Sequence, residues 1–188
     1  RYSDYTIREY IRNFIMSKLE TNTIDTVSGT TNLTIGSNNS STVTFESGAA
    51  TGQNYPAFSA TLNTNQSLTQ STYVKVIYDT EVFDTDSAFD TSTGRFTVPS
   101  GKAGKYFFTA TVSMLNNYTY VQLDFYKNGS SIYRGTAINN DTSATNVNAV
   151  IDLSASDYVE VYCRQSHATN SAEGGNNHTH FHGYRIGA

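Results

Sequence analysis

Three histidines alternate near the C-terminal end of the chain, and they are the side chains best suited to chemistry. His178, His180 and His182 stand in the run Asn-Asn-His-Thr-His-Phe-His-Gly. Successive side chains of a β-strand point to opposite faces, so a strand here would place all three on one face. Imidazole is a common ligand of first-row transition metals, so the pattern predicts a metal site. The alternative is that these histidines form hydrogen bonds or face solvent.

A second candidate site is the acidic run that contains Asp84, Asp86 and Asp90. Carboxylate oxygens at this spacing suit calcium, although the glycine of a helix-loop-helix calcium loop is absent. A surface acidic turn is the alternative interpretation.

Catalytic motifs are absent from the sequence. It contains no Gly-x-Ser-x-Gly, no His-Glu-x-x-His and no phosphate-binding glycine loop. The other carboxylates are scattered, so their spacing defines no acid–base pair: Glu81, Asp124, Asp152, Asp157 and Glu160. The net charge of −4 and the absence of a basic run argue against nucleic-acid binding. No apolar run of about 18 residues exists to span a bilayer. Because catalytic motifs are absent, we expect a protein that is not an enzyme.

Tyrosine is abundant, with 14 residues. Several tyrosines fall on the polar positions of predicted strands: Tyr118, Tyr120, Tyr126, Tyr133, Tyr158 and Tyr162. Exposed tyrosines often mark contacts with carbohydrate or protein. An interface between copies of this chain is an equally good interpretation.

Residues 55–188 must supply the strands that position these side chains. Apolar residues recur at every second position in four segments, which is typical of half-buried strands. They are Tyr106, Phe108, Ala110 and Val112; Val121, Leu123 and Phe125; Val147, Ala149, Ile151 and Leu153; and Val159, Val161 and Cys163. Asn128-Gly129 predicts a hairpin turn, and Cys163, the single cysteine, is expected to be buried. The pattern indicates an antiparallel sandwich or barrel.

Residues 1–20 predict one amphipathic helix. Its apolar face contains Ile7, Ile11, Phe14 and Ile15. So short a helix is marginal alone in water, so this face needs a partner. The partner could be copies of the helix, the following domain or another protein.

Residues 21–54 differ in texture and are rich in Thr and Asn. Short apolar pairs two residues apart, separated by Gly- and Asn-rich turns, favour a β-rich shaft wound from several chains. A flexible polar linker is the alternative.

The spacing of aromatic residues in the third segment resembles one family. Tyr78, Asp84, Phe89 and Phe96 are followed by Gly104-Lys105-Tyr106-Phe107-Phe108, and the chain closes on Phe181-His182-Gly183-Tyr184. This order is similar to the signature of the complement C1q globular head and of tumour-necrosis-factor-like proteins. Tyr78 stands where that signature usually has Phe. The resemblance covers about residues 55–188.

This resemblance implies a ten-stranded antiparallel jelly-roll sandwich that forms a homotrimer. In a trimer each histidine near the threefold axis would appear three times, so a metal ion at the axis is possible, and calcium is a second possibility. The helix and shaft before the head resemble a phage or viral fibre.

We therefore expect a trimeric structural or adhesion protein on a virion surface. Its helix would contact another virion protein, and its head would contact a host glycan or protein. The alternative is a secreted, extracellular trimeric ligand or lectin-like module.

Overall fold

The computed structural model describes residues 56–116, 120–139, 144–168, 170–175 and 178–187. The predicted helix of residues 1–20, with Ile7, Ile11, Phe14 and Ile15, and the predicted shaft of residues 21–54 lie outside the described residues. Tyr118 also lies outside them.

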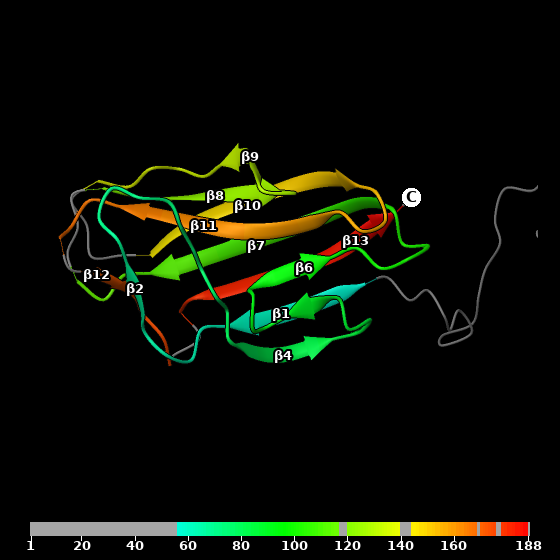
Figure 1. Cartoon of the computed structure of the whole chain (residues 1–188), viewed down its shortest axis with the longest axis horizontal. Helices are drawn as coiled ribbons and strands as arrows, with labels where there is room; N and C mark the ends of the chain where they lie inside the picture. Colours follow the sequence, from blue (N-terminus) through cyan, green and yellow to red (C-terminus); the bar gives the residue numbers. More distant parts are fainter. Residues whose placement is uncertain (1–55, 117–119, 140–143, 169, 176–177, 188) are drawn as a thin grey trace, which may run out of the picture. The chain divides into compact units, whose positions relative to one another are not determined.

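Alternating apolar and polar residues form two main antiparallel sheets (Figure 1). The five-stranded sheet has the order β10 (Ala144–Leu153), β7 (Gly104–Ser113), β13 (His180–Gly187), β1 (Ala57–Thr61) and β4 (Thr80–Asp84). The six-stranded sheet has the order β5 (Phe89–Asp90), β6 (Arg95–Thr97), β11 (Tyr158–Gln165), β8 (Val121–Lys127) and β9 (Ser130–Arg134), with β3 (Val74–Lys75) also paired to β11. A small sheet joins β12 (Asn170–Ala172) to β2 (Gln66–Leu68).

Strands far apart in the sequence lie side by side. The C-terminal strand β13 pairs with β1 on one side and with β7 on the other, and Figure 1 shows the red β13 beside the green β7. The turn between β8 and β9 contains Asn128 at φ 50° and Gly129 at φ 81°. Positive φ at both central residues is what a tight hairpin requires, so the predicted Asn-Gly turn is confirmed.

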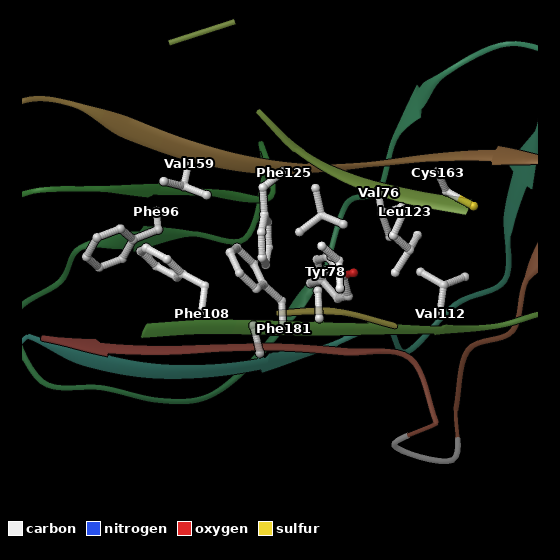
Figure 2. Packing of buried hydrophobic residues seen from close by; sticks show 14 of the residues in the cluster. Val76, Tyr78, Phe96, Phe108, Val112, Leu123, Phe125, Val159, Cys163 and Phe181 are labelled. Atoms are coloured by element: carbon white, nitrogen blue, oxygen red, sulfur yellow. The ribbon is translucent and has the colours of Figure 1, made fainter. Parts of the chain in front are cut away.

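The core lies between the two main sheets. Figure 2 shows Val159, Phe125 and Cys163 pointing from one sheet toward Phe108, Phe181 and Val112 of the other. These side chains are at most 1% exposed. Burial raises the pKa of Cys163 to about 12, so the thiol stays protonated and packs as a small apolar group.

The residues of the aromatic signature occupy this core or shape it. Tyr78, Phe89, Phe96, Tyr106, Phe108 and Phe181 are all buried. Asp84 ends β4, and its carboxylate accepts hydrogen bonds from the amides of Asp86 and Phe89 at 3.2 and 2.7 Å. The carboxylate of Asp84 therefore stabilises the turn that precedes Phe89, whose side chain is buried in the core.

The predicted fold class is confirmed: the described residues form an all-β antiparallel sandwich. They contain thirteen strands rather than ten, because segments of two or three residues such as β3 and β5 also pair. Among these residues no helix is long and apolar enough to cross a bilayer.

Candidate functional site

The outward-facing side chains of β13 form the centre of the candidate site. Phe181 and Gly183 point into the core and are buried, whereas His180, His182 and Tyr184 alternate with them and are partly exposed. The strand is the third of five in its sheet, so neighbours flank it on both sides. The outer face of the five-stranded sheet consequently presents these three side chains near its middle.

His180 and His182 lie against each other on this face. Their rings stack with centroids 4.6 Å apart and an angle of 27° between the planes. Nδ1 of His182 lies 2.9 Å from Oγ of Ser59, the residue directly opposite it on β1. Burial, and secondarily the neighbouring His180, lower the pKa of His182. The half-buried ring of His182 is therefore biased toward its neutral form, which is the form that binds metals.

His178 precedes β13 and occupies a different environment. Its Nδ1 lies 3.6 Å from the carboxylate of Glu173, and 59% of its side chain is exposed. The structure thus brings His180 and His182 together and directs His178 toward Glu173. Within one copy of the chain, the described residues contain no group of three or more His, Cys, Asp or Glu side chains arranged to hold a metal.

Apolar side chains surround the histidines on the same outer face. One row runs across four strands from Val150 through Phe107 and Tyr184 to Ala57. The rings of Phe107 and Tyr184 are 5.6 Å apart, and Val150 and Tyr184 are 50% and 51% exposed. Contiguous exposed apolar residues on a sheet face mark an interaction surface.

The neighbouring row carries the histidine pair. It runs from Asn148 through Thr109, His182 and Ser59 to Phe83, which is 48% exposed. Motifs and spacing in the sequence do not identify the large apolar residues of these rows as site residues: Phe83, Phe107, Val150 and Tyr184. The sequence did contain one sign of this surface: large apolar residues stand at strand positions where the alternation would place polar residues.

The acidic residues of the candidate calcium site bind the protein's own backbone and hydroxyl groups. Asp90 accepts hydrogen bonds from the amide and hydroxyl of Ser92 at 2.8 and 2.6 Å, and from the hydroxyl of Thr93 at 2.8 Å. These bonds lower the pKa of Asp90. Asp84 and Asp90 both accept hydrogen bonds from residues that follow them in the chain, so both carboxylates cap turns.

The scattered carboxylates serve mostly as ion-pair partners. Asp157 lies 2.8 Å from Nζ of Lys127, and Asp124 lies 3.3 Å from Nε of Arg134. Glu160 lies 3.1 Å from Lys75 and 2.8 Å from Arg95. These pairings account for the charges of three of the five carboxylates: Asp124, Asp157 and Glu160.

The tyrosines predicted to make contacts, apart from Tyr118, lie mainly on the six-stranded sheet. Tyr126, Tyr158 and Tyr162 share the outward parity of β8 and β11, and Tyr120 directly precedes β8. This places them on the six-stranded sheet and separates them from the histidine pair. Tyr133 lies on the edge strand β9 and is 47% exposed.

Comparison with known proteins identifies the family. The model of the C1q domain family matches residues 57–186. The globular domain of zebrafish complement 1qA is 21% identical, with 70% of this chain and 98% of that chain covered and a TM-score of 0.49. Murine APRIL, in its crystal structure at pH 8.0, is 12% identical, with 70% and 98% covered and a TM-score of 0.54. The PRD1 vertex protein P5 is 11% identical, with 71% and 96% covered and a TM-score of 0.54. No match was found among curated protein sequences.

Domains of the C1q and TNF-like type are generally non-enzymatic ligand or recognition modules, and they generally form homotrimers. C1q domain proteins are typically secreted or extracellular. Because their sequence identity is low, the solved structures show only that the fold is shared. The family model, in contrast, matches more than half of the 188 residues. The chain therefore belongs to the C1q domain family.

Proposed function

We propose that the chain is a non-enzymatic, homotrimeric structural and adhesion protein of a virus particle, such as a fibre, spike or decoration protein of a tailed phage. The head lies on the virion surface and binds a host glycan or protein. The observation that carries the assembly is the outer face of the five-stranded sheet. Phe83, Val150 and Tyr184 are each about half exposed there in a single copy. Burying them between copies stabilises a trimer by about 25 cal/mol per Å² of apolar surface.

A contact that uses two different patches of the same chain closes into a ring when its rotation is 120°. Three copies of the outer face then meet around one axis. In this arrangement the His180–His182 pair is repeated three times and offers up to six imidazole rings. We propose that these rings hold one transition-metal ion, since imidazole suits zinc, copper, iron and nickel.

The N-terminal residues complete the proposed protein. Residues 1–20 anchor it to another virion protein through the apolar face formed by Ile7, Ile11, Phe14 and Ile15, and residues 21–54 form the shaft. Two features support a particle-bound protein. The residues before the head contain no Gly-X-Y repeat of the kind that forms a collagen stalk. The PRD1 vertex protein P5 shares the fold, so the fold is compatible with a place at a vertex.

A secreted trimeric ligand or lectin-like recognition module is the second candidate function. Family membership favours it, because C1q domain proteins are typically secreted or extracellular. Mass spectrometry of purified particles separates the two candidates. Stoichiometric recovery of the chain with particle proteins supports the first, and recovery in cell medium without particles supports the second.

The assembly itself is tested by sedimentation equilibrium on the full chain. We expect three times the 20.6 kDa chain mass. Tyr184→Arg places a charge in the proposed interface and should give monomers. Tyr133→Arg is the matched control, because Tyr133 is similarly exposed, at 47%, but belongs to β9 of the six-stranded sheet. A monomeric wild-type chain, or a trimer in the Tyr184 variant, would contradict the proposed interface.

A further inference from the structure

The outer face of the six-stranded sheet carries a second cluster of polar and aromatic side chains. Paired residues across β11 and β8 include Glu160 with Tyr126 and Tyr162 with Asp124. Their neighbours in each strand, such as Leu123, Phe125 and Val161, fill the core, so this set faces away from it. We call the set the tyrosine–arginine face; it comprises Tyr73, Tyr126, Tyr162, Asp124, Arg134 and Arg164.

Stacked rings form its aromatic part. The rings of Tyr126 and Tyr162 are 4.0 Å apart and nearly parallel, at 28°. Tyr73 extends the group, with its ring 6.3 Å from that of Tyr126. All three side chains are partly exposed. Partly exposed aromatic rings offer apolar surface that packs against the apolar face of a sugar ring. The hydroxyl of Tyr73 donates to Oε1 of Gln122 at 3.3 Å, so this ring would contact a sugar through its apolar part.

Two guanidinium groups lie beside this aromatic surface. Those of Arg134 and Arg164 are 6.0 and 5.8 Å from the ring centre of Tyr73. Nε of Arg164 donates to the carbonyl of Ser71 at 3.3 Å, and no carboxylate of the described residues forms an ion pair with this side chain. Arg134 uses its Nε for Asp124, and 60% of its side chain is exposed. Terminal guanidinium nitrogens therefore remain available for a planar anion.

A buried carboxylate oxygen without a donor provides the independent observation. Asp124 is fully buried, and its Oδ2 accepts from Oγ of Ser131 at 2.9 Å and from Nε of Arg134 at 3.3 Å. Its Oδ1 is buried and receives no hydrogen bond from the described residues. A buried polar atom of this kind normally has a partner.

Glu160, on the same sheet face, shows the contrast. It is 2% exposed and binds Nζ of Lys75 at 3.1 Å and Nε and Nη2 of Arg95 at 2.9 and 2.8 Å. Its charge is compensated within the chain. On this face, the groups that can still form hydrogen bonds are therefore Oδ1 of Asp124, which is an acceptor, and the terminal guanidinium nitrogens of Arg134 and Arg164, which are donors.

We infer that the tyrosine–arginine face binds an acidic saccharide. The sugar carboxylate accepts hydrogen bonds from Arg164 and Arg134, the sugar ring packs on the tyrosines, and a sugar hydroxyl donates to Oδ1 of Asp124. Since Oδ1 is buried in the free chain, a neighbouring side chain must shift to admit the hydroxyl. This inference rests on the proposed recognition role, but it requires neither the trimer nor the virus particle.

The chemistry of the face favours a sugar over a nucleic acid. Both ligands stack on aromatic rings and carry negative charge. The phosphodiester backbone has no hydrogen to donate to the Asp124 carboxylate, so a nucleic acid would need a base amino group or a ribose hydroxyl at this position. A saccharide carries several hydroxyls on every ring. The chain as a whole carries −4, which opposes a polyanion but permits one carboxylate at a local pair of arginines.

The test uses the full chain with 3′-sialyllactose and trigalacturonate as acidic probes and lactose as the neutral probe. Binding is measured by titration calorimetry or ligand-observed NMR at low salt. We expect at least one acidic probe to bind about tenfold or more tightly than lactose, since a charge-assisted arginine–carboxylate contact is worth that much. Added salt should weaken this binding.

Variants then locate the binding. Arg164→Gln should weaken the acidic probe about tenfold, and Tyr126→Leu should weaken it by removing the aromatic plane. Arg185→Gln is the matched control. It loses the same charge, but Arg185 belongs to β13 of the other main sheet and donates through Nε and Nη2 to the carbonyl of Ala103. If Arg164→Gln does not fold, Arg164→Lys keeps the charge without the planar fork and should still weaken binding severalfold.

Three results would overturn the inference. They are the absence of binding by both acidic probes at millimolar concentration, equal binding of lactose, and unchanged affinity in the folded Arg164 variants. Binding of a ten-residue oligothymidylate in place of the sugars would reassign the face to nucleic acid. The chain's mass in solution and its presence in particles are measured separately, so failure here is distinguishable from failure of the proposed function.

Discussion

Gly183 of β13 leaves the space that the aromatic ring of Phe108 occupies. A Cβ atom built on Gly183 would lie 2.4 Å from Cδ1 of Phe108 and 2.7 Å from Cε1 of Phe58. Both rings are buried in a cluster of stacked and tilted aromatics and have little room to withdraw. The glycine of the closing strand is thus required by packing, because it lets aromatic side chains approach the backbone.

We expect Gly183→Ala to destabilise the head by about 2 kcal/mol, because the added methyl group overpacks the core. Gly187→Ala is the matched control in the same strand, since a Cβ there meets nothing within 4 Å. Denaturant unfolding at one fixed chain concentration measures both, so that any assembly contributes equally. Equal stability of the two variants would contradict the packing argument.

Replacing Tyr78 with phenylalanine should stabilise the head. Its hydroxyl is fully buried and has no hydrogen-bond partner among the described residues, and burial raises the pKa of Tyr78 well above its usual value. Removing an unsatisfied hydroxyl of this kind should stabilise the head by about 1 kcal/mol.

Tyr106→Phe supplies the control for this prediction. Tyr106 is equally buried, but its hydroxyl donates to the carbonyl of Lys102. Its loss should destabilise the head by about 1 kcal/mol. Opposite signs for the two substitutions are expected in thermal or denaturant unfolding, and a loss of stability in both would contradict the assignment for Tyr78.

Asp157 should make stability depend on pH in the acid range. Its carboxylate binds Nζ of Lys127 at 2.8 Å, Nδ2 of Asn128 at 2.7 Å and the amide of Ser154 at 2.8 Å. These bonds, with Lys127 first, lower the pKa of Asp157 from 3.8 to about 2. The folded chain therefore binds fewer protons than the unfolded chain between these values, so the stabilisation is present above pH 3.8 and is lost as the pH falls toward 2.

The measurement compares the wild type with Asp157→Asn. We expect the difference in unfolding free energy to be constant above about pH 5 and to shrink between about pH 4 and pH 2. NMR titration of the Asp157 carboxyl group provides the direct check. A difference that does not change with pH would contradict the assignment.

The proposed metal at the trimer axis predicts stoichiometric metal in purified protein. Elemental analysis should find it in the wild type and in His178→Ala, because His178 faces Glu173. It should be lost in His182→Ala and reduced in His180→Ala. Acidification should release the ion, because protonated imidazole cannot bind a metal. Metal-free trimers that are as heat-stable as metal-loaded ones would contradict the proposal.

The sequence by itself determined the local structure of the head. Alternation at every second residue assigned Phe108 and Val161 to the core side of their strands, because a strand has two faces and one is buried. Asn128-Gly129 specified a hairpin, because its positive φ angles cost least at these residue types. The spacing from Tyr78 to Phe108 was enough to indicate the family.

The tertiary structure decided which side chains meet across strands that are distant in the sequence. Placing β13 between β1 and β7 puts His182 beside Ser59. Pairing β11 with β3 and β8 brings Arg164 close to Tyr73. Periodicity determines the face on which each residue lies, but strand order and register depend on how the whole core packs. Alternation within one strand does not specify that packing, so the contacts of His182 with Ser59 and of Arg164 with Tyr73 are visible only in the three-dimensional arrangement.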